Sequence, residues 1–128
     1  MSRSVLVIED DLDLLGLMEM ILSDAGHAVR TATDGQQGLA RVAEELPGLI
    51  LLDMRMPVMN GWEFAREFRA RYGHASPIVV ITAAENARQR AAEIGAEGWL
   101  SMPFELEEVR ALVTRFLGSQ PTQDASPR

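Results

Sequence analysis

Five short apolar runs alternate along the chain with longer segments whose apolar residues recur at helical spacing. The runs cover residues 5–8, 28–31, 49–52, 78–81 and 98–100, and each is typical of a buried strand. The spacing of the apolar residues between them predicts helices around residues 14–22, 39–46, 62–69, 85–94 and 106–116. Strict alternation of strand and helix indicates a parallel sheet with helices on both faces.

This alternation predicts an α/β fold, a doubly wound five-stranded parallel sheet of flavodoxin-like type with strand order 2-1-3-4-5 and five helices. A chain of 128 residues can bury one core, so we expect a single domain over residues 1–118. Residues 119–128 are polar, include two prolines and show no periodicity, which predicts a disordered tail or a linker to an output domain. Met1, close before the first strand, suggests a native start.

The composition of the chain argues against several classes of function. A net charge of −7 argues against direct nucleic-acid binding by this domain. No apolar stretch reaches membrane-spanning length and the chain does not begin with a hydrophobic signal segment, so we expect a cytoplasmic protein without a membrane partner. The chain has no cysteine, which excludes disulfides and thiolate metal sites. All 12 basic residues are arginine, so a lysine phosphate clamp is excluded as well.

Acidic residues follow two of the expected strands at the point where each strand ends. Glu9, Asp10 and Asp11 follow the first strand, and Asp53 follows the third. The carboxyl ends of parallel strands meet at one edge of a sheet, where ligands bind in such folds. Crowded carboxylates repel one another, and oxygen ligands of this kind suit Mg²⁺. We therefore expect a Mg²⁺ site at this edge, and we assign Asp11 to capping of the first helix instead.

The chain resembles the receiver domain of bacterial two-component response regulators over about residues 4–117. The matching residues are Glu9-Asp10, Asp53, Met56-Pro57, Gly61, Thr82-Ala83, Gly95-Ala96 and Pro103-Phe104. Each match alone is weak, but their ordered combination is specific.

The resemblance implies that Asp53 accepts a phosphoryl group from a phosphohistidine. It also implies that Asp10, Asp53 and the backbone carbonyl of Arg55 ligate Mg²⁺ directly, with Glu9 acting through water. By the same resemblance, the Thr82 hydroxyl and the Ala83 backbone N–H donate hydrogen bonds to the phosphoryl oxygens. A desolvated carboxylate is a competent nucleophile when a metal offsets the charge of the incoming group.

Met102 is the main departure from the family pattern. The last motif of the family pattern is Lys-Pro-Phe, whereas this chain has Met102-Pro103-Phe104. The resemblance implies that the ammonium group of the family's lysine contacts the phosphoryl group. Three carboxylates against the two positive charges of Mg²⁺ leave one negative charge that no lysine here balances. One lost charge-assisted contact is worth roughly 1.5–3 kcal/mol. From the family's turn at this point we expect the Met102–Pro103 peptide bond to be cis.

Two other positions bear on the switch that the resemblance implies. Trp99 stands where the family usually has tyrosine or phenylalanine, a ring that moves inward when the threonine is drawn to the phosphoryl group. Indole is larger than phenol, so this movement is expected to be restricted. Arg55, two residues past Asp53, overhangs the site in the family and is our candidate compensating cation; Arg88 and Arg90 are more remote candidates.

The implied phosphoryl donor is a sensor histidine kinase or a phosphotransfer protein of a phosphorelay. The implied downstream target is a protein that docks on the face formed by the fourth helix, fifth strand and fifth helix. We expect no enzyme activity beyond the domain's own phosphoryl transfer and autodephosphorylation.

Two alternatives are considered. The first is a phosphorylation-independent interaction module whose switch has decayed, which the missing lysine favours and the full acid set opposes. The second is a metal-dependent phosphatase of the haloacid-dehalogenase type, which we set aside because Arg55 stands where a second aspartate is needed.

Overall fold

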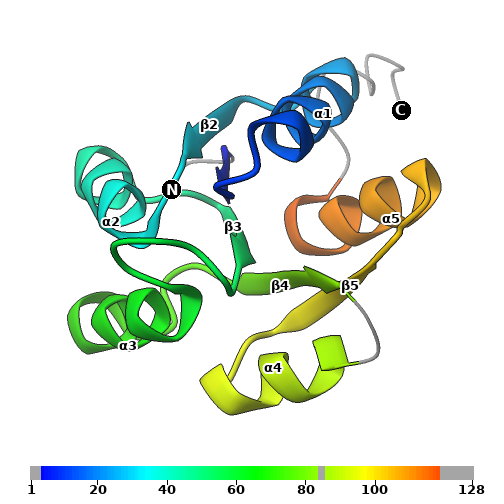
Figure 1. The fold of residues 1–128 in the computed structure, drawn as a ribbon. Coiled ribbons are helices and arrows are strands. Elements are labelled where there is room, and N and C mark those ends of the chain that lie inside the picture. The colour runs from blue at the N-terminus through cyan, green and yellow to red at the C-terminus, as the bar shows by residue number, and fades with distance from the viewer. Residues whose placement is uncertain (1–3, 84–85, 119–128) are drawn as a thin grey trace.

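The computed structural model describes residues 4–83 and 86–118. Its strands are β1 (Val5–Ile8), β2 (Val29–Ala32), β3 (Leu49–Asp53), β4 (Ile78–Ala83) and β5 (Gly98–Met102). Its helices are α1 (Leu12–Asp24), α2 (Gly35–Glu44), α3 (Gly61–Tyr72), α4 (Ala87–Ile94) and α5 (Leu106–Leu117). All strands are parallel and lie in the order β2-β1-β3-β4-β5, which confirms the predicted topology (Figure 1).

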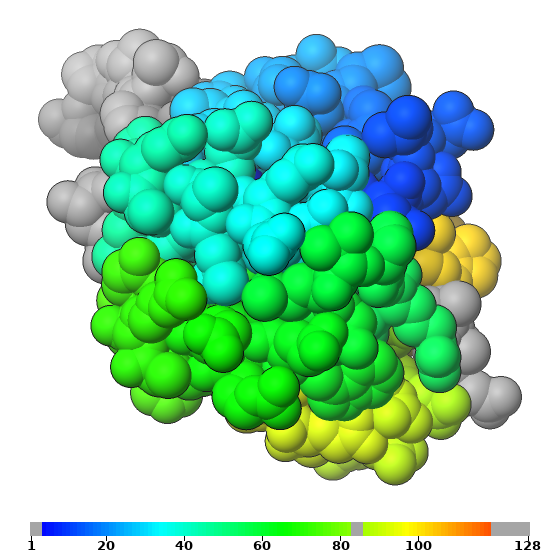
Figure 2. Space-filling view, turned by 60° about the vertical axis from the view of Figure 1, so that its left-hand side comes forward, coloured from blue at the N-terminus to red at the C-terminus, as the bar shows by residue number. Residues whose placement is uncertain are grey.

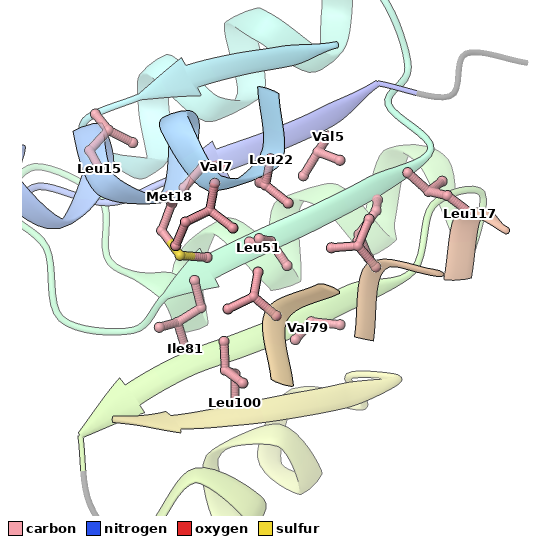
Figure 3. Close-up of a cluster of buried hydrophobic side chains, with 14 residues drawn as sticks. Val5, Val7, Leu15, Met18, Leu22, Leu51, Val79, Ile81, Leu100 and Leu117 are labelled. Carbon is pink, nitrogen blue, oxygen red and sulfur yellow. The ribbon is translucent and has the colours of Figure 1, made fainter. Parts of the chain in front are cut away.

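Alternate side chains of the three central strands enter two separate cores, one on each face of the sheet. The first core lies between the sheet and helices α1 and α5, and Figure 3 shows part of it. It contains Val5, Val7, Leu49, Leu51, Val79 and Ile81 from these strands. The second core lies under α2, α3 and α4 and contains Leu6, Ile8, Ile50, Leu52, Ile78 and Val80. Complete burial on both faces explains why these strands read as unbroken apolar runs.

The predicted boundaries differ from the observed ones where polar residues end a strand. β4 and β5 each run two residues past the predicted end, to Ala83 and Met102, because backbone pairing continues after the apolar run stops. The second strand is shifted by one residue, and the second helix ends before Leu46, which still packs against the second core. In α5, Val109 and Val113 are buried as expected, whereas Leu106 is exposed.

Capping fixes where α1 begins, directly after the acidic residues. The Asp11 carboxylate accepts hydrogen bonds from the backbone N–H groups of Asp13 (3.0 Å) and Leu14 (3.2 Å). The capping role predicted for Asp11 is therefore confirmed, and its carboxylate is committed to the helix rather than to the acidic cluster.

Figure 2 shows the molecule from the side of α2 and α3, with α4 next to α3. None of the helices in the described ranges is long and apolar enough to cross a membrane. The expected tail, residues 119–128, lies outside the described residues.

Candidate functional site

The register of the sheet brings the acidic residues together. Ile8 pairs with Leu52, so the next residues along, Glu9 directly after β1 and Asp53 at the end of β3, lie at the same level. Ligand oxygens of Glu9, Asp10 and Asp53 all lie within 4.8 Å of one another. Glu9 is only 4% exposed, Asp53 is half-buried and Asp10 is exposed. The predicted acidic cluster is thus assembled at the carboxyl edge of the sheet.

Burial gives this cluster unusual electrostatics. Burial raises the pKa of Glu9 to about 8, and the nearby carboxylate of Asp53 adds to the rise. The Asp11 backbone N–H, which donates to Glu9 Oε2 at 3.1 Å, opposes it. Burial also raises the pKa of Asp53, and the proximity of Asp10 contributes to that rise. A cation bound among these oxygens would lower the pKa values of Glu9 and Asp53, since it favours the ionised form of each carboxyl group.

The donor set fits a hard divalent cation. The three ligand atoms that lie together are carboxylate oxygens, which Mg²⁺ prefers, and exposed Asp10 leaves room for the waters that Mg²⁺ keeps.

A tightly packed loop holds Asp53 in place. The Arg55 backbone N–H points at Asp53 Oδ1 across 3.4 Å, and the Gly61 N–H donates to the Met54 carbonyl at 3.0 Å. A Cβ at Gly61 would lie 2.7 Å from Met54 Cα and 2.8 Å from the Asp53 carbonyl oxygen, so only glycine fits. Val58 in the same loop has a φ of +68°, a conformation that β-branched residues rarely adopt.

A pocket of about 230 Å³ opens beside Asp53. It is lined by Asp53, Met54, Arg55, Trp62, Thr82, Asn86 and Arg90. The structure therefore brings the predicted Thr82 and Arg55 to the same pocket as the Asp53 carboxylate. Sequence reasoning did not find Trp62 or Asn86 as site residues, because neither belongs to a recognisable motif.

The remaining predicted residues lie at the end of β4 and on or directly after β5. Ala83 ends β4 and pairs in register with Met102 on β5. Met102 is half-buried and packs against the first core, the one under α1 and α5. The Met102–Pro103 peptide bond is cis, as predicted. Trp99 is 45% exposed, and the Arg88 guanidinium carbon lies 5.9 Å from its ring centre, so this ring faces outward.

Known proteins share both the sequence pattern and the fold. Residues 5–114 match the family described as "Response regulator receiver domain". The Response regulator ArlR of Staphylococcus aureus is 33% identical over 122 residues, which make up 94% of this chain and 55% of that protein. The chain thus spans about half the length of the curated relatives it matches.

Among solved structures, the receiver domain of NtrX from Brucella abortus has a TM-score of 0.82 at 28% identity, covering 91% of this chain and 100% of that one. The chemotaxis protein CheY4 of Vibrio cholerae also has a TM-score of 0.82, at 32% identity and with the same coverage. Receiver domains are signalling modules of two-component systems that typically bind Mg²⁺ at an acidic pocket, and this chain has an acidic cluster of Glu9, Asp10 and Asp53. The chain belongs to the response regulator receiver domain family.

Proposed function

We propose that this domain is phosphorylated on Asp53 by a partner histidine kinase or phosphotransfer protein, with Mg²⁺ bound by Glu9, Asp10, Asp53 and the Arg55 backbone carbonyl. The observation that carries the proposal is the gathering of three carboxylates within 4.8 Å at the sheet edge, one of them opening into a pocket. Crowding of this kind is costly without a cation, because burial and mutual repulsion both oppose ionisation.

The proposed chemistry needs little from the protein besides positioning and charge. A carboxylate oxygen of Asp53 attacks the phosphorus of a phosphohistidine, the new P–O bond forms as the P–N bond breaks, and the imidazole leaves with the electron pair. Mg²⁺ supplies charge stabilisation of the transferred phosphoryl group. Thr82 lines the same pocket as Asp53, and we propose that its hydroxyl and the N–H of Ala83 donate hydrogen bonds to phosphoryl oxygens.

The proposed output surface is the face of α4, β5 and α5. A groove of about 300 Å³ on this face is lined by Trp99, Leu100, Glu108, Ala111, Leu112 and Arg115. Trp99 and Leu100 belong to β5, and β5 pairs with the end of β4 that carries Thr82. A change at Asp53 that moves Thr82 would therefore reach the groove through one strand pair. We place this signalling in the cytoplasm and assign the domain no separate substrate.

A phosphorylation-independent interaction module is the second candidate. The observation that favours it is the packing of Met102 against the first core, where an apolar thioether stabilises the resting arrangement and offers no charge to a phosphoryl group.

Intact-protein mass spectrometry after incubation with acetyl phosphate and Mg²⁺ separates the two. We expect a phosphate adduct on the wild type and on the control variant Asp24→Asn, which changes an exposed aspartate at the end of α1. Asp53→Asn should carry none. A wild type that stays unmodified, or an adduct that persists in Asp53→Asn, would contradict phosphorylation at this residue.

A further inference from the structure

The pocket beside Asp53 carries a second positive charge, from a residue that the sequence made only a remote candidate. Its wall includes Arg90 of α4 as well as Arg55 of the loop after β3. We infer that Arg90 binds the phosphoryl group on Asp53 and supplies the positive charge that Met102 does not. This inference rests on the proposed phosphorylation of Asp53.

Contacts between α3 and α4 hold the Arg90 side chain in position. Its Nη1 donates to both carboxylate oxygens of Glu93, at 2.8 and 2.9 Å. The indole Nε1 of Trp62 donates to Glu93 Oε1 at 2.9 Å, and the guanidinium carbon of Arg90 lies 5.8 Å from the Trp62 ring centre. The Arg90 side chain is consequently only 22% exposed. Glu93 and Trp62 together fix the guanidinium at the pocket wall.

Arg90 also retains donors for a ligand. A guanidinium has five N–H groups, and within the described part of the chain only those of Nη1 are hydrogen-bonded. Nε and Nη2 can therefore bind phosphoryl oxygens while Nη1 stays on Glu93. A phosphoryl group adds one phosphorus and three oxygen atoms to Asp53, which a pocket of about 230 Å³ accommodates.

The other basic candidates are less suited to this role. Arg55 is exposed and forms no ion pair within residues 4–83 and 86–118, so binding must first order a flexible side chain. Arg88 lies against Trp99 and does not line the pocket. Arg90 is already ordered, so less entropy is lost when it binds.

The contacts of Arg90 would couple phosphorylation of Asp53 to α4. An anion in the pocket attracts the guanidinium of Arg90, whose Nη1 donates to Glu93. Glu93 also accepts a hydrogen bond from Trp62 of α3. The α3–α4 junction therefore senses the phosphoryl charge directly, in addition to any movement of Thr82. Helix α4 buries only the small side chains of Ala87 and Ala91, so it is lightly anchored.

Calorimetric titration with beryllofluoride, a phosphoryl mimic, in saturating Mg²⁺ tests the assignment. Arg90→Gln should weaken beryllofluoride binding about 10-fold or more, the loss expected for one charge-assisted hydrogen-bonding partner. Arg88→Gln, the matched control on the same helix, should bind like the wild type. Arg90→Lys should recover part of the loss, and adding Met102→Lys to Arg90→Gln should recover it by supplying a cation from β5.

Titration with Mg²⁺ alone provides the second readout, and it should give the same affinity in Arg90→Gln as in the wild type. An equal loss of Mg²⁺ affinity would overturn the assignment, because the defect would then lie in the metal site. Arg90→Gln binding beryllofluoride within about twofold of the wild type would also overturn it, and a loss confined to Arg55→Gln would assign the role to Arg55. If the wild type binds Mg²⁺ but no beryllofluoride, the proposed phosphorylation of Asp53 fails and this inference fails with it.

Discussion

The buried carboxyl group of Glu9 should make the metal-free domain less stable as the pH rises, and Mg²⁺ should reverse this. Burial raises the pKa of Glu9 from an ordinary 4.5 to about 8, with Asp53 adding to the rise, so the folded protein keeps a proton that the unfolded chain releases. Stability is then greatest below pH 4.5 as far as Glu9 is concerned, and it falls as the pH rises through the interval up to about 8.

The size of the effect follows from linkage. One extra proton on the folded state changes the free energy of unfolding by about 1.4 kcal/mol per pH unit. Raising the pH from about 5.5 to about 7.5 stays inside the interval, so the loss approaches about 3 kcal/mol. The raised pKa of Asp53 acts in the same direction. Mg²⁺ binds the ionised carboxylates, so its stabilising effect should grow over the same pH range.

Urea unfolding at three pH values in this range, with a chelator and then with Mg²⁺, measures both effects. Glu9→Gln is the control, because it removes the titrating carboxyl group that faces Asp10 and Asp53 and leaves the two histidines of the chain unchanged. The difference between the two proteins isolates Glu9. If wild type and Glu9→Gln lose the same free energy of unfolding between the lowest and highest pH, the electrostatic description of the site is wrong.

Three further predictions concern stability. Gly61→Ala should lower the free energy of unfolding in urea by roughly 1–3 kcal/mol, because the added Cβ meets loop backbone. Gly16→Ala should instead raise it by about 0.5–1 kcal/mol, because Gly16 lies on the exposed face of α1 with open space around it, and equal effects would contradict this. Ser76→Ala should lower the free energy of unfolding by about 1–3 kcal/mol, since the fully buried hydroxyl donates to the Pro47 carbonyl at 2.6 Å. Ser101→Ala, at an exposed position, should be nearly neutral. A neutral Ser76→Ala would show that this hydrogen bond does not stabilise the fold. Amide hydrogen exchange should be faster in α4 than in α1, which buries four larger side chains, and equal protection would contradict a lightly anchored α4.

The sheet and its acidic edge could be predicted because both depend on local pattern and on topology. Strands buried on two faces read as apolar runs, and the rule that parallel strands end at one edge was enough to bring Glu9 and Asp53 together. The boundaries of β4 and β5 could not be placed, because backbone pairing of Thr82 with Ser101 needs no apolar side chain.

The surroundings of Arg90 lay beyond sequence reasoning for a different reason. The residues that hold its guanidinium come from two helices, with Trp62 lying 31 residues before Glu93. No periodicity or motif relates positions so far apart, and only the packing of α3 beside α4 brings them together. The packing of Met102 against the first core could not be predicted either. A methionine at this position is compatible with both a core and a pocket, because its flexible side chain suits either.

Chemical trapping of the phosphorylated residue tests the central proposal most directly. After incubation with acetyl phosphate and Mg²⁺, borohydride reduces an aspartyl phosphate to homoserine, and peptide mass spectrometry locates the change. We expect homoserine at position 53 and unchanged aspartate at position 10. Homoserine at another aspartate, or none in protein that carries a phosphate adduct, would contradict Asp53 as the phosphoryl acceptor.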